Sequence, residues 1–108
     1  MPIGREQVKR LYNQFRRRYF ADDDLPDFDT LDFEFESCPD EFGYVEWDAH
    51  GCPNLSLDPI CQEWTSLLKS TLLHEQIHLK LGPNAGHGKR FYEEGLRIMS
   101  LGAVKHFL

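Results

Sequence analysis

The sequence predicts an α+β fold in which one helix, three short strands and two further helices follow one another. Three observations predict this order. Apolar residues recur at helical spacing near the N-terminus, apolar and acidic residues alternate in the middle, and a long helix-prone stretch follows. The chain has 108 residues, 41% apolar and 13% aromatic, which is enough for one modest core. We therefore expect residues 1–108 to form a single domain.

The first element is an amphipathic helix over roughly residues 5–20. Its apolar residues follow the spacing i, i+3, i+4, i+7 and i+11, which places them on one face: Val8, Leu11, Tyr12, Phe15 and Tyr19. Arg16, Arg17 and Arg18 fall on its outer side. Residues 21–29, which include Pro26, are predicted to form a loop.

Three strands are expected next. Residues 31–36 alternate between apolar and acidic side chains, which is typical of a strand with one buried and one acidic face. Residues 43–47 and 54–57 are predicted to form the second and third strands, with a turn before each. Because connections this short favour hairpins, we expect a mainly antiparallel sheet.

Two helices complete the predicted fold. Asp58 is suited to cap a helix and Pro59 to begin one. The second helix is therefore expected over residues 60–81, with a break near residues 64–65. The last helix spans roughly residues 89–102.

The net charge of −6 is distributed unevenly along the chain. Residues 1–20 contain six basic residues and one acidic residue, whereas every charged residue from 22 to 48 is acidic. Arg16, Arg17 and Arg18 could form a small phosphate-binding patch that makes weak contact with nucleic acid. The alternative is a solvated helix face whose charge the acidic stretch offsets. The overall acidity favours that alternative, because it opposes tight nonspecific binding to nucleic acid.

Composition also bears on the compartment. No apolar run approaches the ~20 residues that a membrane-spanning helix needs, and the N-terminus lacks the apolar core of a signal peptide. Three cysteines without the spacing of a disulfide scaffold favour a reducing environment. We therefore expect a cytoplasmic protein that does not contact a membrane. Cys52 and Cys61 are interpreted as small buried hydrophobes, and Trp47 and Trp64 as core residues.

The second helix carries the segment His74-Glu75-Gln76-Ile77-His78, an H-E-x-x-H pattern. On a helix, positions 74 and 78 lie on nearly the same face, about 6 Å apart, so two imidazoles can bind one Zn²⁺. Glu75 can then reach a water molecule at the metal and act as a general base. Catalytic zinc usually has three protein ligands and one position for water, so a third ligand is needed.

Two candidates for the third ligand lie downstream. Gly82 and Pro83 must end the helix, so the chain reverses and His87, which lies between two glycines, can turn back toward the metal. The other candidate is Glu93 or Glu94 on the last helix, as in zinc enzymes that use two histidines and a glutamate.

The sequence around these histidines resembles the SprT-like zinc metallopeptidase domain. The resemblance depends on the segments STLLHEQIH, residues 70–78, and GHGKRF, residues 86–91. The N-terminal segment over residues 11–20, followed by Leu25-Pro26, is similar to the opening helix of that family. In all, the resemblance covers roughly residues 8–98.

This resemblance implies a minimal zincin-like fold and a zinc-dependent endopeptidase acting on protein or peptide substrates. It implies His74, His78 and His87 as zinc ligands and Glu75 as the catalytic carboxylate. It also implies that an edge strand, here residues 54–57, pairs with an extended substrate.

Two other functions stay open. A non-catalytic binding module stabilised by zinc would close the metal site with a fourth protein ligand, such as Glu93, Glu94 or a cysteine. A DNA-associated protease acting on DNA-bound proteins would use the face that carries residues 16–18. Relatives with that role carry further DNA-binding or zinc-ribbon segments, and no two cysteines here form a C-x₂-C pair.

Overall fold

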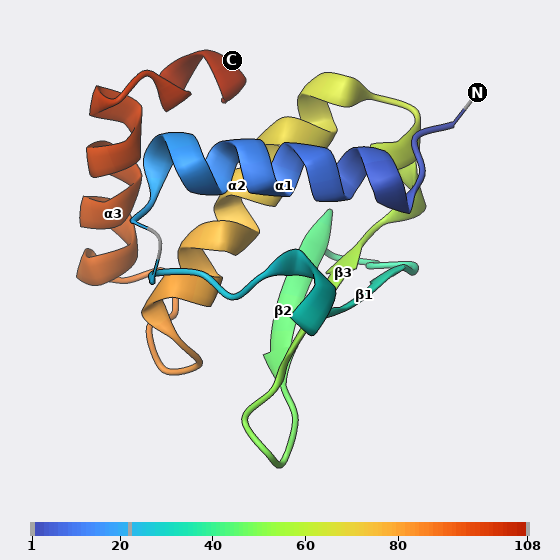
Figure 1. The fold of residues 1–108 in the computed structure, drawn as a ribbon, viewed down its shortest axis with the longest axis horizontal. Helices are drawn as coiled ribbons and strands as arrows, with labels where there is room; N and C mark the ends of the chain where they lie inside the picture. Colours follow the sequence, from blue (N-terminus) through green and yellow to red (C-terminus); the bar gives the residue numbers. More distant parts are fainter. Residues whose placement is uncertain (1, 22, 108) are drawn as a thin grey trace.

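Helices and strands follow one another in the order that the sequence predicts. The computed structural model describes residues 2–21 and 23–107. Figure 1 shows an α+β fold with these elements: α1 (Arg5–Tyr19), β1 (Asp32–Phe35), β2 (Gly43–Trp47), β3 (Pro53–Leu57), α2 (Thr65–Leu81) and α3 (Lys89–Ser100). Three short 3₁₀ segments, Phe28–Thr30, Pro59–Gln62 and Ala103–His106, occupy connections between or after them. Asp22, in the predicted loop, lies outside the described residues.

The apolar face of α1 is buried as expected. Its buried residues are Val8, Tyr12, Phe15 and Tyr19. The Tyr12 hydroxyl donates a hydrogen bond to the Pro26 carbonyl oxygen at 2.7 Å, which fixes the loop after the helix. Gln76 of α2 donates from its buried side-chain amide to the Tyr12 carbonyl oxygen at 3.1 Å, so α1 is joined directly to α2.

Part of the positive charge of α1 is neutralised by the segment that follows it. Lys9 forms an ion pair with Asp29 at 2.8 Å, and Arg16 forms one with Asp27. Arg17 and Arg18 are exposed. The acidic stretch thus offsets part of the basic charge of α1.

The sheet is mixed, with strand order β1-β3-β2. β3 pairs in parallel with β1 and antiparallel with β2, so the prediction of a mainly antiparallel sheet is wrong. The prediction that residues 54–57 form an edge strand is also wrong, because β3 is the central strand. Its side chains are accordingly well buried: Leu55 and Leu57 are 0% exposed and Ser56 is 4% exposed. Period-two alternation identifies a strand and its buried face, but it does not specify which strand lies beside it.

The connection from the sheet to α2 contains the break that the sequence predicts. The Asp58 carboxylate accepts hydrogen bonds from the backbone N–H groups of Ile60 and Cys38, at 3.0 and 2.9 Å, and so caps the 3₁₀ segment Pro59–Gln62. α2 begins only at Thr65. Trp64 precedes it and is 62% exposed, so its predicted place in the core is wrong.

α2 is the most enclosed helix of the three. It contacts α1, α3, β2 and β3, and apolar side chains on several of its faces are buried, as a helix surrounded by other elements requires: Leu68, Leu72, Leu73, Ile77 and Leu79. Cys61, just before α2, is buried as predicted, whereas Cys52 is exposed, contrary to prediction. Among the described residues, no helix combines the length and apolar character needed to cross a bilayer.

Candidate metal centre

Three histidines converge on one point at the C-terminal half of α2. His74 and His78 lie one turn apart, with ring centroids separated by 5.0 Å. His87 reaches them from the turn between α2 and α3: its Nε2 atom is 3.1 Å from Nε2 of His74 and 3.0 Å from Nε2 of His78. The potential ligand atoms of all three lie within 4.8 Å of one another. The three residues are therefore close enough to bind a single metal ion.

Glycines shape the turn that brings His87 back. Gly82 ends α2 with φ of 89°, and its N–H donates to the His78 carbonyl oxygen at 2.9 Å. Gly86, directly before His87, has φ of 57°. Both angles lie in the left-handed region that side chains with a Cβ rarely adopt, so the reversal requires glycine at these two positions.

The spacing and chemistry of the three nitrogens fit a zinc ion. Tetrahedral ligands at about 2.0–2.1 Å from zinc lie about 3.3–3.4 Å apart, close to the 3.1 and 3.0 Å that separate Nε2 of His87 from Nε2 of His74 and of His78. Burial, and then the neighbouring His78 and His87 rings, lower the pKa of His74 to about 4. Burial, and then His87, lower the pKa of His78. Near neutral pH both imidazoles are thus in the neutral form that binds metals.

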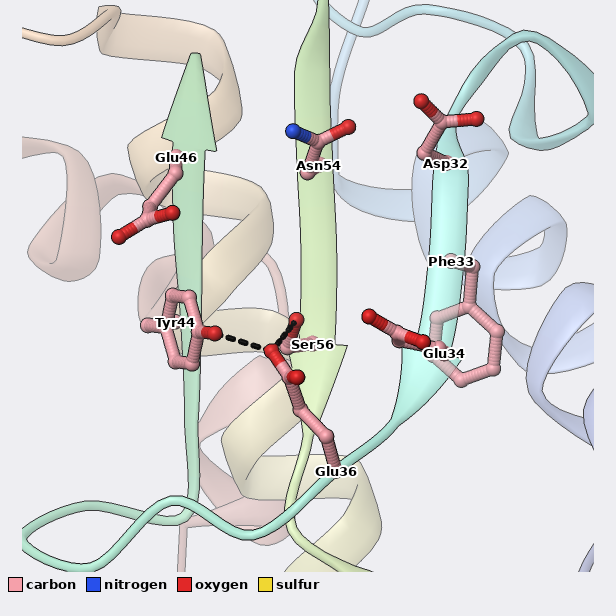
Figure 2. A pocket seen from close by; sticks show the side chains of 8 residues that line it. All are labelled: Asp32, Phe33, Glu34, Glu36, Tyr44, Glu46, Asn54 and Ser56. Carbon is pink, nitrogen blue, oxygen red and sulfur yellow. Dashed lines mark hydrogen bonds between the residues drawn. The ribbon is translucent and has the colours of Figure 1, made fainter. Parts of the chain in front are cut away.

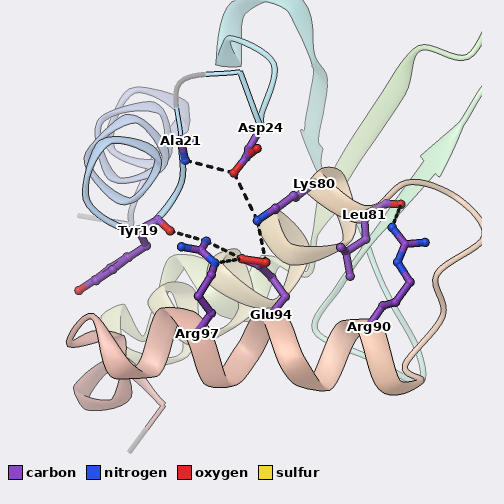
Figure 3. A network of polar contacts seen from close by, with 8 residues as sticks. All are labelled: Tyr19, Ala21, Asp24, Lys80, Leu81, Arg90, Glu94 and Arg97. Carbon is purple, nitrogen blue, oxygen red and sulfur yellow. Dashed lines mark hydrogen bonds and ion pairs between the residues drawn. The ribbon is translucent and has the colours of Figure 1, made fainter.

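The alternative third ligands lie elsewhere. The buried carboxylate of Glu94 points to Lys80, at 2.7 Å, and to Arg97, as Figure 3 shows. Glu93 lies on the exposed side of α3 and pairs with Lys89 at 3.7 Å. Within residues 2–21 and 23–107, the metal-binding cluster contains three histidines and neither glutamate.

Glu75 lies beside the cluster in a cavity of about 480 Å³. Its side chain is buried, with 2% of the residue exposed, and it lines the cavity together with His74, Thr71, Gly43 and Glu41. Burial, and then the Glu41 carboxylate, raise the pKa of Glu75 to about 8. Without metal, the carboxyl group is therefore mostly protonated near neutral pH, and the positive charge of a bound ion would favour the carboxylate form that a general base requires.

Phe91 supports the three imidazoles, although the sequence assigned it no role. Its ring centroid is 4.8 Å from that of His74, 4.7 Å from that of His78 and 5.0 Å from that of His87. The sequence signal is an apolar residue in the first turn of the helix that comes after His87. Contact with all three rings makes Phe91 a positioning residue that restricts their orientation.

A second hollow lies on the outer face of the sheet, apart from the histidines. It measures about 470 Å³, and Figure 2 shows the side chains that line it: Asp32, Phe33, Glu34, Glu36, Tyr44, Glu46, Asn54 and Ser56. Glu36 accepts hydrogen bonds from the hydroxyl groups of Tyr44 and Ser56. Both bonds lower the pKa of Glu36, and the bond from Tyr44 lowers it more. The predicted acidic face of β1 contributes to this surface.

Comparison with known protein families and with curated proteins identifies no relative. No model of a known protein family matches the sequence, and no curated protein matches it significantly. A function for this protein must therefore be inferred from the geometry of the three histidines, Glu75 and Phe91.

Proposed function

We propose that this protein is a zinc-dependent endopeptidase of the SprT-like, minimal zincin type. The observation that carries the proposal is the convergence of His74, His78 and His87 beside the buried carboxyl group of Glu75. Zinc, when bound there, would supply a Lewis acid that makes water more acidic and polarises a carbonyl oxygen.

The protein's own groups would divide the remaining work. Nε2 of each of the three histidines would hold the ion. The Glu75 carboxylate would take a proton from the attacking water and deliver it to the amine nitrogen that leaves when the peptide bond breaks. Its buried position supports this role, because a low-polarity environment strengthens its interactions with a proton and with nearby charge.

The substrate backbone would lie along β2. This strand is at an edge of the sheet, and its first residue, Gly43, is packed closely against α2. A Cβ atom built at Gly43 would lie 2.9 Å from Thr71 Cγ2, and Thr71 and Gly43 line the same cavity as Glu75. An extended peptide that added itself to β2 would therefore pass close to Glu75.

The three-histidine cluster favours catalysis over a purely structural metal site. A structural zinc site is closed by four protein ligands. Among the described residues the cluster contains three, with Glu93 and Glu94 paired to Lys89 and to Lys80 and Arg97 instead. A role on DNA has less support, because Lys9 and Arg16 of α1 pair with Asp29 and Asp27, which leaves Arg17 and Arg18 as the exposed cations of the predicted face.

The test is cleavage of unfolded casein by the zinc-loaded protein and by its Glu75→Gln variant. Glutamine matches the size of the carboxyl group but cannot accept the proton. We expect the variant to bind one zinc per chain and to cleave about 10²–10⁴-fold more slowly. Cleavage near the wild-type rate would contradict the role of Glu75.

Two further arms separate the competing functions. His87→Ala is expected to lose both zinc and cleavage, because the third ligand is removed. Single-stranded DNA is expected to leave the wild-type rate unchanged. DNA stimulation that rising salt suppresses would instead support a protease acting on DNA-bound proteins through residues 16–18.

A further inference from the structure

Exposed apolar side chains gather at the start of α2. Phe42 is 52% exposed, Ile60 44% and Trp64 62%. They come from three separate segments: the residue before β2, the 3₁₀ segment Pro59–Gln62 and the residue before α2. Together they line a groove of about 420 Å³ whose other walls are Ser66, Leu67, Ser70 and Phe107. None of the groove's lining residues carries a charge.

This groove, which we call the apolar groove, is continuous with the cavity that contains Glu75 and His74. The two hollows share four lining residues: Phe42, Leu67, Ser70 and Phe107. Along α2 the connection follows one helix face, because Leu67 precedes His74 by seven residues, or about two turns. A peptide bond held at Glu75 would thus have the apolar groove directly beside it.

The walls of the apolar groove are held by the backbone rather than by each other. The Phe42 carbonyl oxygen accepts a hydrogen bond from the Asp58 N–H at 2.8 Å. The Asp58 carboxylate in turn caps Ile60 at 3.0 Å. Leu67 and Phe107 pack against the core. The backbone at Phe42 and Ile60 and the side chains of Leu67 and Phe107 are thus held in place before a ligand binds, which lowers the cost of ordering the groove.

We propose that the apolar groove is a specificity pocket that binds a bulky apolar side chain of the substrate, of the size of leucine or phenylalanine, at a fixed position relative to the cleaved bond. This inference depends on the proposed peptidase function. An uncharged groove of this size gains from covering apolar surface and offers a charged side chain no partner of opposite sign. The carboxylates of Asp40 and Glu41 line the adjoining cavity, so they would repel an acidic substrate residue next to the apolar one.

The first experiment maps the bonds that the zinc-loaded protein cleaves in unfolded casein. We expect a bulky apolar residue at one constant position beside the cleaved bonds. Two quenched peptides are then made that differ only there, with phenylalanine or serine. The wild type is expected to cleave the phenylalanine peptide with a kcat/KM at least about tenfold higher.

Variants assign that preference to the groove. Ile60→Ala and Trp64→Ala remove exposed side chains, so both proteins should fold. Each is expected to lower kcat/KM for the phenylalanine peptide several-fold and so to narrow its advantage over the serine peptide. The matched control is Leu96→Ala on α3. This leucine is 52% exposed, between Ile60 and Trp64, and lies outside both hollows. This control should behave as the wild type with both peptides.

Binding provides a readout that does not require turnover. Zinc-loaded Glu75→Gln is expected to bind the phenylalanine peptide more tightly than the serine peptide and to shift the indole N–H resonance of Trp64. Cleavage or binding without an apolar preference would overturn the specificity pocket and leave the peptidase intact. If Leu96→Ala lowered kcat/KM for the phenylalanine peptide as much as the groove variants do, the specificity pocket would also be overturned and the peptidase left intact. Failure of the zinc-loaded wild type to cleave any peptide would overturn the peptidase and the pocket together.

Discussion

Phe91 is the side chain on which the three imidazoles rest, with ring centroids 4.7–5.0 Å away. Phe91→Ala would remove this support and let the rings rotate away from a common point. Residues that orient metal ligands without binding the metal typically contribute 10–100-fold to affinity, so we expect zinc affinity to fall about tenfold. Competition with a chromogenic chelator measures it.

The neighbouring Tyr92→Ala is the control for this change. Tyr92 is also aromatic and in the first turn of α3, but it is 68% exposed. Its removal should leave zinc affinity as in the wild type. An unchanged affinity in Phe91→Ala would show that the histidines do not need this contact.

At the scale of elements, a cluster of charges fixes α3 against α2 and against the end of α1. Glu94 of α3 contacts Lys80 of α2 at 2.7 Å and Arg97 one turn further on. Arg97 also donates to the Tyr19 carbonyl oxygen at 2.7 Å, and Lys80 reaches Asp24 at 3.3 Å (Figure 3). The turn that carries His87 lies between these two helices, so this cluster holds both of its ends.

Glu94→Ala is therefore expected to destabilise the fold without removing a metal ligand. It leaves two cations without their buried partner, which should lower the free energy of unfolding by about 2 kcal/mol. Glu93→Ala breaks an exposed pair and should change it by less than about 0.5 kcal/mol. Urea denaturation measures both, and both proteins should bind one zinc. Loss of zinc from folded Glu94→Ala would show that the metal site depends on Glu94, either as a ligand or through the turn that carries His87.

The same scale explains which parts of the fold the sequence could predict. Periodicity located α1 and β1, turn residues located β2 and β3, and the Asp58-Pro59 pair located the start of the helical segment before α2, because these features depend on neighbouring residues. The partner of β3 depends on the path of the whole chain between residues 36 and 53, and local alternation carries no information about it. The exposure of Trp64 is hard to predict for a related reason: this residue lies in the break between the 3₁₀ segment and α2, where its side chain points outward.

The candidate site also has parts that the sequence could predict and parts that it could not. The one-turn spacing of His74 and His78 follows from helix geometry alone. The glycines around His87 indicated a reversal but not where it would end, and so Glu93 and Glu94 stayed open as alternatives. Only the packing of α3 against α2 separates these cases, because it pairs Glu94 with Lys80 and Arg97 and brings His87 to the other two histidines.

At the scale of the whole molecule, burying Glu75 makes the stability of the metal-free protein depend on pH. Its pKa is raised from 4.5 to about 8. Between these values the unfolded chain releases the proton and the folded protein keeps it, so stability falls as the pH rises. Glu75→Gln has no such proton. The lowered pKa values of His74 and His78 affect both proteins alike.

We therefore expect the wild type to lose stability relative to Glu75→Gln as the pH rises from 5 to 8, by roughly 3 kcal/mol. Urea denaturation of both proteins in the presence of a chelator, at several pH values in this range, measures the difference. A difference that does not change with pH would mean that Glu75 is ionised in the fold throughout.

The proposed function depends above all on His74, His78 and His87 holding one zinc ion and leaving a position for water. X-ray absorption at the zinc edge of the protein loaded with one equivalent of metal tests this most directly. We predict three imidazole nitrogens at about 2.0–2.1 Å and one further light atom, which a protein lacking His87 should not reproduce. A sulfur ligand at about 2.3 Å, or an unchanged spectrum for zinc-loaded His87→Ala, would contradict the three-histidine site.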